Sequence, residues 1–556
     1  AGLRVDQFNN ARLSYMDFYN EALSRDSMDA RVNIEVGKHY IRQAEWDKAE
    51  KHLLRAKARL EHDYTRVFDT EANYYIGYVY RMTGRRMLAE ENLWAATYTP
   101  TFKHPAYYQL AVMATEEGNV EKALGLVDEA LLTGAHDLQA LTLKSYLLRK
   151  AGQKGEAKKV IDQIKSIDPL DYWSEFEQSF LEHDNVSFLA STRSRRSEGI
   201  IAVQELLEVV NNYLNIGDKE ASLAILDEAV KVGAPFSEYP LVQIYRAYSM
   251  LPANKQGALE ALAKANTLSA DNNFPLRVEE VGMFNKLVGI NPDNYAIHYY
   301  LGNLLYYLGQ KDKALAEWYK AVELNPGFAL AQRNIGFGEG VKANYDEAIR
   351  HYDIAIQHNP DDPLLLAESD KLCEKANIDT RLRQRRLEKH LNTVLKYDDA
   401  VMRLLRTYNA NGEYKKAAAI ENNRHFHLWE GGGEIHSIYE ETHMRYGESL
   451  LAKKQYAKAI KEFELATLYP TQLEVSEPNN DGCKAKAYHL IGKAYEGLGK
   501  HAEATGAFTK SANATTGSEI EYMCYKALSL REIGKEDEAR ALIKAIGDKC
   551  ESMERN

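Results

Sequence analysis

YAIHYYLGNLLYYLGQKDKALAEWYKAVELNP, the stretch at residues 295–326, decides the fold because its pattern returns one unit later in the chain. Ala314 and Ala348 are 34 residues apart, and the same interval separates Pro326 from Pro360. Each copy has an apolar residue before a glycine, then an alanine, an aromatic residue four positions later and a second alanine. These positions are Leu301, Gly302, Ala314, Trp318 and Ala321 in one copy, and Ile335, Gly336, Ala348, Tyr352 and Ala355 in the other. A period of this length indicates stacked pairs of helices.

The residue types of this pattern predict a helix–turn–helix hairpin. Gly302 and Ala314 are small, which allows the two helices to approach closely, and Trp318 lies at helical spacing to fill the remaining gap. Gly309 lies where the turn needs a positive φ, and Pro326 ends the second helix. One hairpin cannot bury its apolar face alone, so neighbouring hairpins must stack and share a core.

The unit resembles the tetratricopeptide repeat, a helix–turn–helix motif of 34 residues. This resemblance implies an all-α fold, a tetratricopeptide-type α-solenoid in which hairpins form a right-handed superhelix. Degenerate copies of the pattern recur along the chain, and we expect about twelve hairpins in all.

The quality of the repeat pattern divides the chain into seven segments. We expect an N-terminal repeat array (1–167), an irregular junction (168–200), degenerate hairpins (201–293), two regular repeats (294–362), junction helices with a degenerate repeat (363–422), a histidine- and glycine-rich insert (423–443) and a C-terminal array (444–556).

Composition argues against several classes of function. The chain has 556 residues and a net charge of −11, so it lacks the basic footprint of a nucleic-acid-binding protein. No apolar run reaches the roughly 18–20 residues that a membrane span needs. The four cysteines show no metal-like spacing, and we expect no cofactor. With no signal peptide in view we expect a cytoplasmic location, and Ala1 leaves open whether residues precede it.

The segment TRLRQRRLEKHLNTVLK, residues 380–396, concentrates positive charge. We expect a helix that spans a junction between repeats, with a nucleic-acid site as the weaker alternative because the whole chain is acidic. Its basic residues are Arg381, Arg383, Arg385, Arg386, Lys389 and His390, and its expected buried stripe is Leu382, Leu387 and Leu391.

The insert NRHFHLWEGGGEIHSIYEETH, residues 423–443, is the largest departure from the repeat. Consecutive glycines do not form a stable helix interior, so we expect a loop at Gly431 and Gly432. Three interpretations stay open: a structural loop between repeats, a recognition or docking loop, and a metal site. The four histidines here show no HExxH or comparable spacing, so we predict no metal ligand.

This insert also resembles a block in a family of large bacterial tetratricopeptide proteins that carry an N-terminal β-rich domain of unknown function. The matching residues are Arg424, His427, Trp429, Glu430, Gly431 and Gly432, with Tyr469 and Pro470 at the end of the following repeat and Asp168 to Leu170 earlier in the chain. The resemblance implies that this chain is the helical half of such a protein, with the β-rich domain as one possible partner.

We predict a scaffold or adaptor that binds a protein or peptide, with no catalytic residue and no enzymatic activity. The ligand is expected in the concave groove, whose tyrosine and amide side chains suit peptide contact, or at the glycine-rich loop. The candidate contact residues are Tyr299, Asn303, Tyr306, Arg333, Asn334, His427, Trp429, Glu430, Gly431 and Gly432. The alternative is a helical accessory module of a carbohydrate-active or carbohydrate-binding bacterial protein, for which Glu430 and Glu434, beside the histidines and the flexible glycine run, are the candidate carboxylates.

Overall fold

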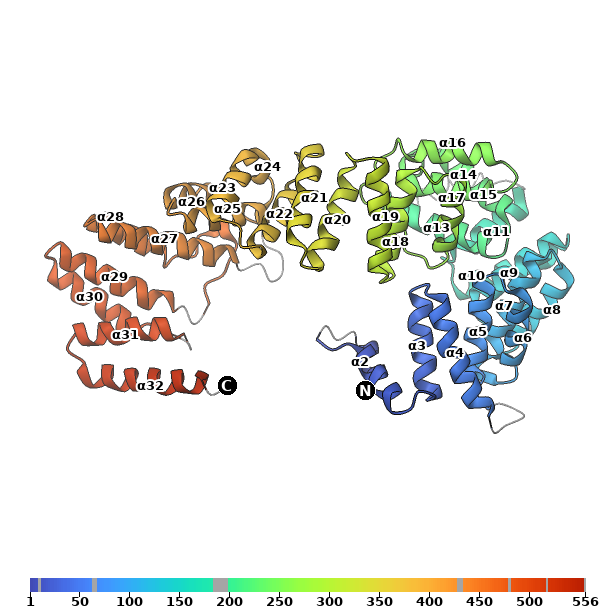
Figure 1. Cartoon of the computed structure of the whole chain (residues 1–556), viewed down its shortest axis with the longest axis horizontal. Coiled ribbons are helices and arrows are strands. Elements are labelled where there is room, and N and C mark those ends of the chain that lie inside the picture. The colour runs from blue at the N-terminus through green and yellow to red at the C-terminus, as the bar shows by residue number, and fades with distance from the viewer. Residues whose placement is uncertain are drawn as a thin grey trace. The chain divides into compact units, whose positions relative to one another are not determined.

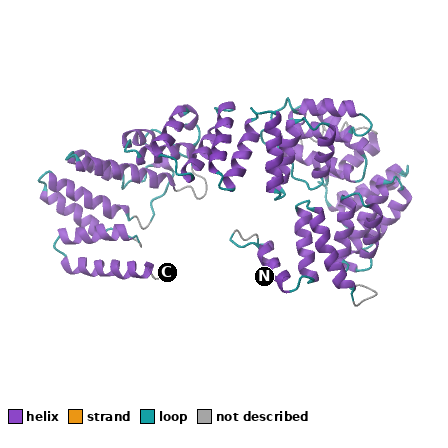
Figure 2. Ribbon diagram, in the orientation of Figure 1, coloured by secondary structure: helices purple, strands orange, loops and turns teal. Residues whose placement is uncertain are grey.

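The computed structural model describes residues 1–8, 12–62, 68–183, 199–427, 434–478, 482–516 and 519–554. Across these ranges the chain forms helices and connecting loops with no β-strand (Figure 2). The all-α prediction is therefore confirmed. Within the same ranges no helix is long and apolar enough to cross a membrane.

The chain divides into two compact units, Ala1–Ala331 and Gln332–Asn556, and the division falls inside helix α20 (Ala329–Val341) (Figure 1). The first unit contains α1 (Gly2–Gln7), α2 (Tyr15–Arg25), α3 (Ala30–Arg42), α4 (Trp46–Glu61), α5 (Glu71–Met82), α6 (Arg86–Ala96), α7 (Pro100–Glu116), α8 (Val120–Leu131), α9 (Leu138–Lys150), α10 (Lys154–Ile167), α11 (Tyr172–His183), α13 (Gly199–Asn215), α14 (Lys219–Val232), η1 (Phe236–Glu238), α15 (Pro240–Ser249), α16 (Lys255–Ala265), α17 (Glu280–Ile290), α18 (Tyr295–Tyr307) and α19 (Lys311–Leu324).

The second unit continues the succession of hairpins. It contains α21 (Tyr345–His358), α22 (Pro363–Lys375), α23 (Thr380–Lys389), α24 (Leu391–Val394), α25 (Asp398–Ala410), α26 (Tyr414–Glu421), α27 (Glu434–Ala452), α28 (Tyr456–Leu465), η2 (Thr471–Leu473), α29 (Cys483–Gly497), α30 (His501–Asn513), α31 (Ile520–Glu532) and α32 (Glu536–Glu554).

A small residue on the first helix receives a large side chain from the second helix in each regular hairpin. A Cβ added to Gly302 would lie 2.5 Å from the Trp318 ring, and one added to Gly336 would lie 2.6 Å from the Tyr352 ring. Gly447 has the same relation to Phe463, at 2.5 Å. These two positions are 16 residues apart in every case. We call them the seam pair, because they let the helices of one hairpin approach closely.

The turn between the two helices also follows the prediction. Gly309 has a φ of 86°, in the left-handed region where a residue without a Cβ is unstrained. Gln310 follows Gly309, and its side-chain amide donates to the backbone oxygen of Gln43, at 2.5 Å. The turn of α18–α19 thus contacts the turn of α3–α4, and the first unit closes on itself.

Arg81 of α5 ties further helices of the first unit together. Its guanidinium donates to Gln109 Oε1 on α7 at 2.9 Å and to Glu116 Oε1 at 2.8 Å. It also donates to the backbone and side-chain oxygens of Asn215 on α13, both at 2.8 Å. These contacts occupy polar groups that would otherwise be available to a ligand.

Candidate functional site

The seam pair changes its chemistry in the hairpin α22–α23. The glycine position, which is Gly336 in the preceding hairpin, is Asp370 here, exactly one 34-residue period later. The aromatic position, occupied by Tyr352 in the preceding hairpin, is Arg386. An aromatic ring packed on a glycine is therefore replaced by a carboxylate and a guanidinium.

Asp370 is buried, and its charge is neutralised by arginines rather than by water. Its carboxylate accepts two hydrogen bonds from Arg383, at 2.7 and 3.0 Å, and both side chains are less than a tenth exposed. Arg403 of α25 adds a third cationic contact at 3.6 Å. A buried carboxylate needs such partners because burial of an unpaired charge is costly. Helix α23 is consequently held to α22 by an ion pair where the regular hairpins use close apolar packing.

Arg386 turns away from Asp370 and bridges two other helices. It binds the carboxylate of Asp353 on α21 and donates to Ser369 Oγ on α22 at 3.2 Å. Arg386 is also one of the residues that line a cavity beside it.

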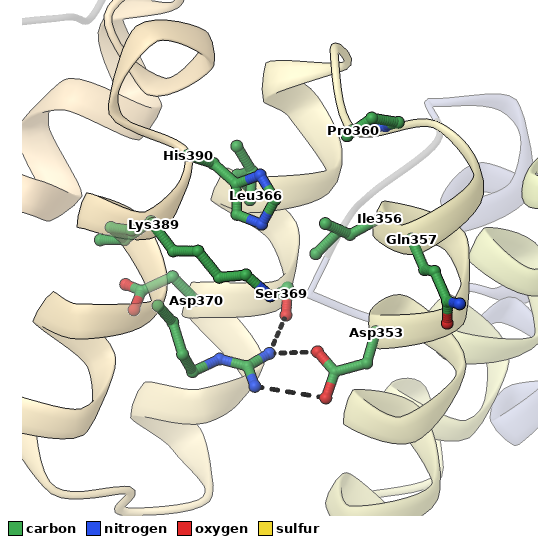
Figure 3. A pocket seen from close by; sticks show the side chains of 11 residues that line it. Asp353, Ile356, Gln357, Pro360, Leu366, Ser369, Asp370, Lys389 and His390 are labelled. Atoms are coloured by element: carbon green, nitrogen blue, oxygen red, sulfur yellow. Dashed lines mark hydrogen bonds and ion pairs between the residues drawn. The ribbon is translucent and has the colours of Figure 1, made fainter.

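A cavity of about 510 Å³ lies at this break in the repeat. Its walls come from α21 with the following loop, α22 and the end of α23, and Figure 3 shows Lys389 and His390 on one side with Ile356 and Gln357 on the other. The lining residues are Asp353, Ile356, Gln357, Pro360, Leu366, Ser369, Asp370, Arg386, Leu387, Lys389 and His390. The volume suits a side chain or a few residues of a peptide.

The cavity has an apolar floor and a polar, cationic rim. Ile356, Leu366 and Leu387 are at most 9% exposed, which places their apolar surface in the interior. Lys389 is exposed and makes no ion pair within the described residues. Burial, Lys389 and Arg386 lower the pKa of His390, so its ring is neutral at pH 7. The arrangement suits an apolar group with an adjoining anion.

Two family models, both described as tetratricopeptide repeat, match residues 281–327 and 485–514. The first match begins in α17 and extends past the end of α19, and the second covers most of α29 and all of α30. The chain therefore contains sequence that matches the tetratricopeptide repeat at these two places.

Several solved structures show a weak likeness to this chain. The crystal structure of YrrB, titled as a tetratricopeptide protein with an unusual peptide-binding site, is 18% identical, and the match covers 45% of this chain and 96% of the other, with a TM-score of 0.21. The Cut9–Hcn1 hetero-tetramer of the APC/C matches at 13% identity over 94% and 100%, with a TM-score of 0.23. MamA from Desulfovibrio magneticus RS-1 matches at 17% identity over 36% and 99%, with a TM-score of 0.22. These scores carry no argument about function.

The predicted groove residues are already engaged in the packing of their own repeats. Tyr299 is 3% exposed and lies against Phe328, with ring centroids 4.9 Å apart. Asn303 Oδ1 accepts a hydrogen bond from Trp318 Nε1 at 3.0 Å, and the ring of Tyr306 stacks on the same tryptophan. These three residues belong to the first unit, and their role in binding stays a prediction.

The remaining predicted contact residues fall in the second unit. Arg333 makes a bidentate ion pair with Glu368, at 2.7 and 2.8 Å, and Asn334 follows it on α20. The His427 side chain is 81% exposed. The other four, Trp429, Glu430, Gly431 and Gly432, lie outside the described residues.

The expected buried stripe of the basic helix is only partly correct. Leu387 is buried, but Leu382 is 43% exposed and Leu391 36% exposed. The reason is the ion pair with Asp370, which turns Arg383 and Leu387, one helical turn apart, toward the interior. Sequence reasoning missed the cavity because it stopped the repeat at Pro360. One more period of 34 residues would have pointed to Asp370 and Arg386.

Proposed function

We propose that this protein is a non-enzymatic scaffold that holds a partner protein by a short peptide segment in the cavity between α21, α22 and α23. The observation that carries the proposal is the cavity itself. It lies beside the hairpin in which Asp370 and Arg386 replace the glycine and the aromatic residue of the seam pair, and its floor is apolar. Repeat arrays of this type present extended surfaces to other chains, and departures from the repeat are where specific contacts concentrate.

The lining selects the chemistry of the segment. An apolar side chain would enter between Ile356 and Leu366 and lose its contact with water. A carboxylate beside it would meet the ammonium of Lys389, which has no competing ion pair within the described residues. The proposed ligand is therefore a peptide with a large apolar residue next to an acidic residue.

A panel of labelled peptides tests this by fluorescence anisotropy on the full chain. Each peptide contains Leu or Phe next to one of three residues: Asp, Asn or Lys. Comparison of the three shows how much of the affinity depends on the negative charge and how much on the apolar side chain. We expect the acidic peptides to bind, and Lys389→Glu to weaken them by about tenfold or more, because a hydrogen bond to a charged group contributes about 1.5–3 kcal/mol.

Lys375→Glu is the matched control. Lys375 is an exposed lysine at the end of α22, it does not line the cavity, and the substitution changes the net charge equally. If both variants lost the same amount of affinity for the acidic peptides, the loss would come from long-range electrostatics, and the proposed site would be rejected. Absence of binding by every peptide would reject it as well.

A further inference from the structure

The strongest unassigned cluster of the second unit is formed by His425, His427 and Glu474. Their ligand-type atoms all lie within 4.8 Å of one another, and all three side chains are exposed. His425 Nε2 lies 2.6 Å from Glu474 Oε1, and His427 Nδ1 lies 3.9 Å from the same oxygen. We propose that these three residues bind a Zn²⁺ ion.

The backbone presents both histidines on one side. Residues 424–427 are not helical, and Phe426 between the two histidines is 1% exposed. In an extended segment alternate side chains point in opposite directions, so burial of Phe426 turns His425 and His427 together toward solvent.

Hydrogen bonds fix this segment from two directions. The amide of Phe426 donates to the backbone oxygen of Gln472 at 2.9 Å, two residues before Glu474. The amide of His427 donates to Asp398 Oδ2 at 2.9 Å, and Arg424 Nε donates to the other oxygen of that carboxylate at 3.0 Å. The ligand atoms are therefore held near one another before any ion arrives, which reduces the entropic cost of binding.

The present distances suit a metal after small side-chain shifts. Zn²⁺ binds imidazole nitrogen and carboxylate oxygen at about 2.0–2.2 Å in a tetrahedral arrangement, which separates neighbouring ligand atoms by about 3.3 Å. The two measured distances to Glu474 Oε1 lie on either side of that value. Two imidazoles and one carboxylate suit Zn²⁺, and such a set leaves a fourth position for water or for a side chain of a partner.

The other two histidines of the insert do not take part. His436 Nε2 bonds the backbone oxygen of Leu468 at 3.1 Å, and His443 Nδ1 bonds Glu462 at 2.8 Å, and both rings are buried in packing around α27. The insert alone does not show the spacing of a metal site, because it holds only two of the three ligands. The third ligand, Glu474, lies 47 residues beyond His427, after the hairpin α27–α28.

Isothermal titration of the full chain with Zn²⁺ tests the site. The titration uses a Cys524→Ser, Cys550→Ser background, because both thiols are exposed and bind zinc themselves. We expect one equivalent of Zn²⁺ per chain and a loss of affinity of at least tenfold in His427→Ala. The His427 side chain is mostly exposed, so this variant keeps the fold. His501→Ala, an exposed histidine at the start of α30, is the matched control and should bind as the parent does.

The substitution Glu474→Gln distinguishes a role of Glu474 as a metal ligand from a role as a hydrogen-bond partner of His425. The amide oxygen of Gln still accepts from His425, so a purely structural role would leave both stability and Zn²⁺ binding unchanged. A ligand role predicts weaker Zn²⁺ binding and a loss of the visible absorption of bound Co²⁺. Zinc binding that is equal in the parent, His427→Ala and Glu474→Gln, or no stoichiometric binding in the parent, would overturn the proposal.

Discussion

Two neighbouring hairpins of the second unit, α20–α21 and α22–α23, place different chemistry at the same seam pair. In the first, Gly336 receives the ring of Tyr352 so closely that a Cβ would lie 2.6 Å from it. In the second, Asp370 and Arg386 occupy the equivalent positions, and Asp370 is neutralised by Arg383 instead. The period of the repeat is unchanged, and a cavity lies between α21 of the first hairpin and the two helices of the second. A cavity thus accompanies two changed residue types at the seam pair, without any insertion between the two hairpins.

The departure extends into the next hairpin, α25–α26, where the seam pair is Leu405 and Glu421. Glu421 is fully buried and accepts a hydrogen bond from the hydroxyl of Thr442 at 2.8 Å. The regular pair then returns as Gly447 and Phe463. The acidic side chains of Asp370 and Glu421 thus occupy seam-pair positions in two consecutive hairpins, which we call the specialised hairpins.

The largest effect is expected from removing the charge that holds the specialised hairpin. Asp370→Ala leaves Arg383 buried without its main partner, and loss of one member of a buried ion pair costs about 3–5 kcal/mol. The change should appear as faster hydrogen exchange of the α22 and α23 amides, which reports the local free energy of opening in a long repeat array.

Glu538→Ala is the control for Asp370→Ala. The variant removes an exposed ion pair between Glu538 and Lys535, whose side chains are 60% and 48% exposed, respectively. Exposed pairs of this kind contribute about 0–1 kcal/mol to stability. If Asp370→Ala changed exchange no more than Glu538→Ala does, the ion pair would not be what holds α23 in place.

A smaller effect is expected in the regular hairpin. Gly336→Ala places a Cβ 2.6 Å from Tyr352 and 3.0 Å from the backbone oxygen of Ala348, and such overpacking costs about 1–3 kcal/mol. Gly506→Ala is the matched substitution, because Gly506 lies within α30 with nothing within 4 Å of an added Cβ. There we expect stabilisation of about 0.5–1 kcal/mol. Chemical denaturation of the two variants should therefore shift in opposite directions, and equal shifts would remove the packing argument.

The sequence was sufficient for the regular hairpins and insufficient for the specialised ones, for a physical reason. Gly302 with Trp318 and Gly336 with Tyr352 are recognisable because apolar packing at a fixed spacing leaves the same residue types in each copy. Asp370 is stabilised by Arg383 and Arg403, whose positions follow from tertiary packing rather than from a period. The cluster of His425, His427 and Glu474 is invisible in sequence for the same reason, since a hairpin separates its members.

The last effect, up to about 1.4 kcal/mol for each pH unit, concerns the carboxyl of Glu421 in the hairpin α25–α26. Burial raises the pKa of Glu421 to about 8, well above the ordinary value of 4.5, so the folded protein keeps this carboxyl protonated where the unfolded chain has already lost the proton. The contribution of this carboxyl to the free energy of unfolding is therefore fully present below about pH 4.5. It is lost as the pH rises toward 8, by up to about 1.4 kcal/mol for each pH unit.

Glu421→Gln should remove that slope, because Gln is neutral at every pH and keeps an acceptor for the Thr442 hydroxyl. Thermal unfolding at pH 6, 7 and 8 measures the difference between parent and variant. If the stability of the parent falls more steeply with rising pH than that of the variant, Glu421 is a buried, neutral carboxyl in the folded protein. Parallel curves would mean that Glu421 is ionised in the folded protein, and the second irregular hairpin would then resemble the Asp370 hairpin, in which a buried charge is retained and paired.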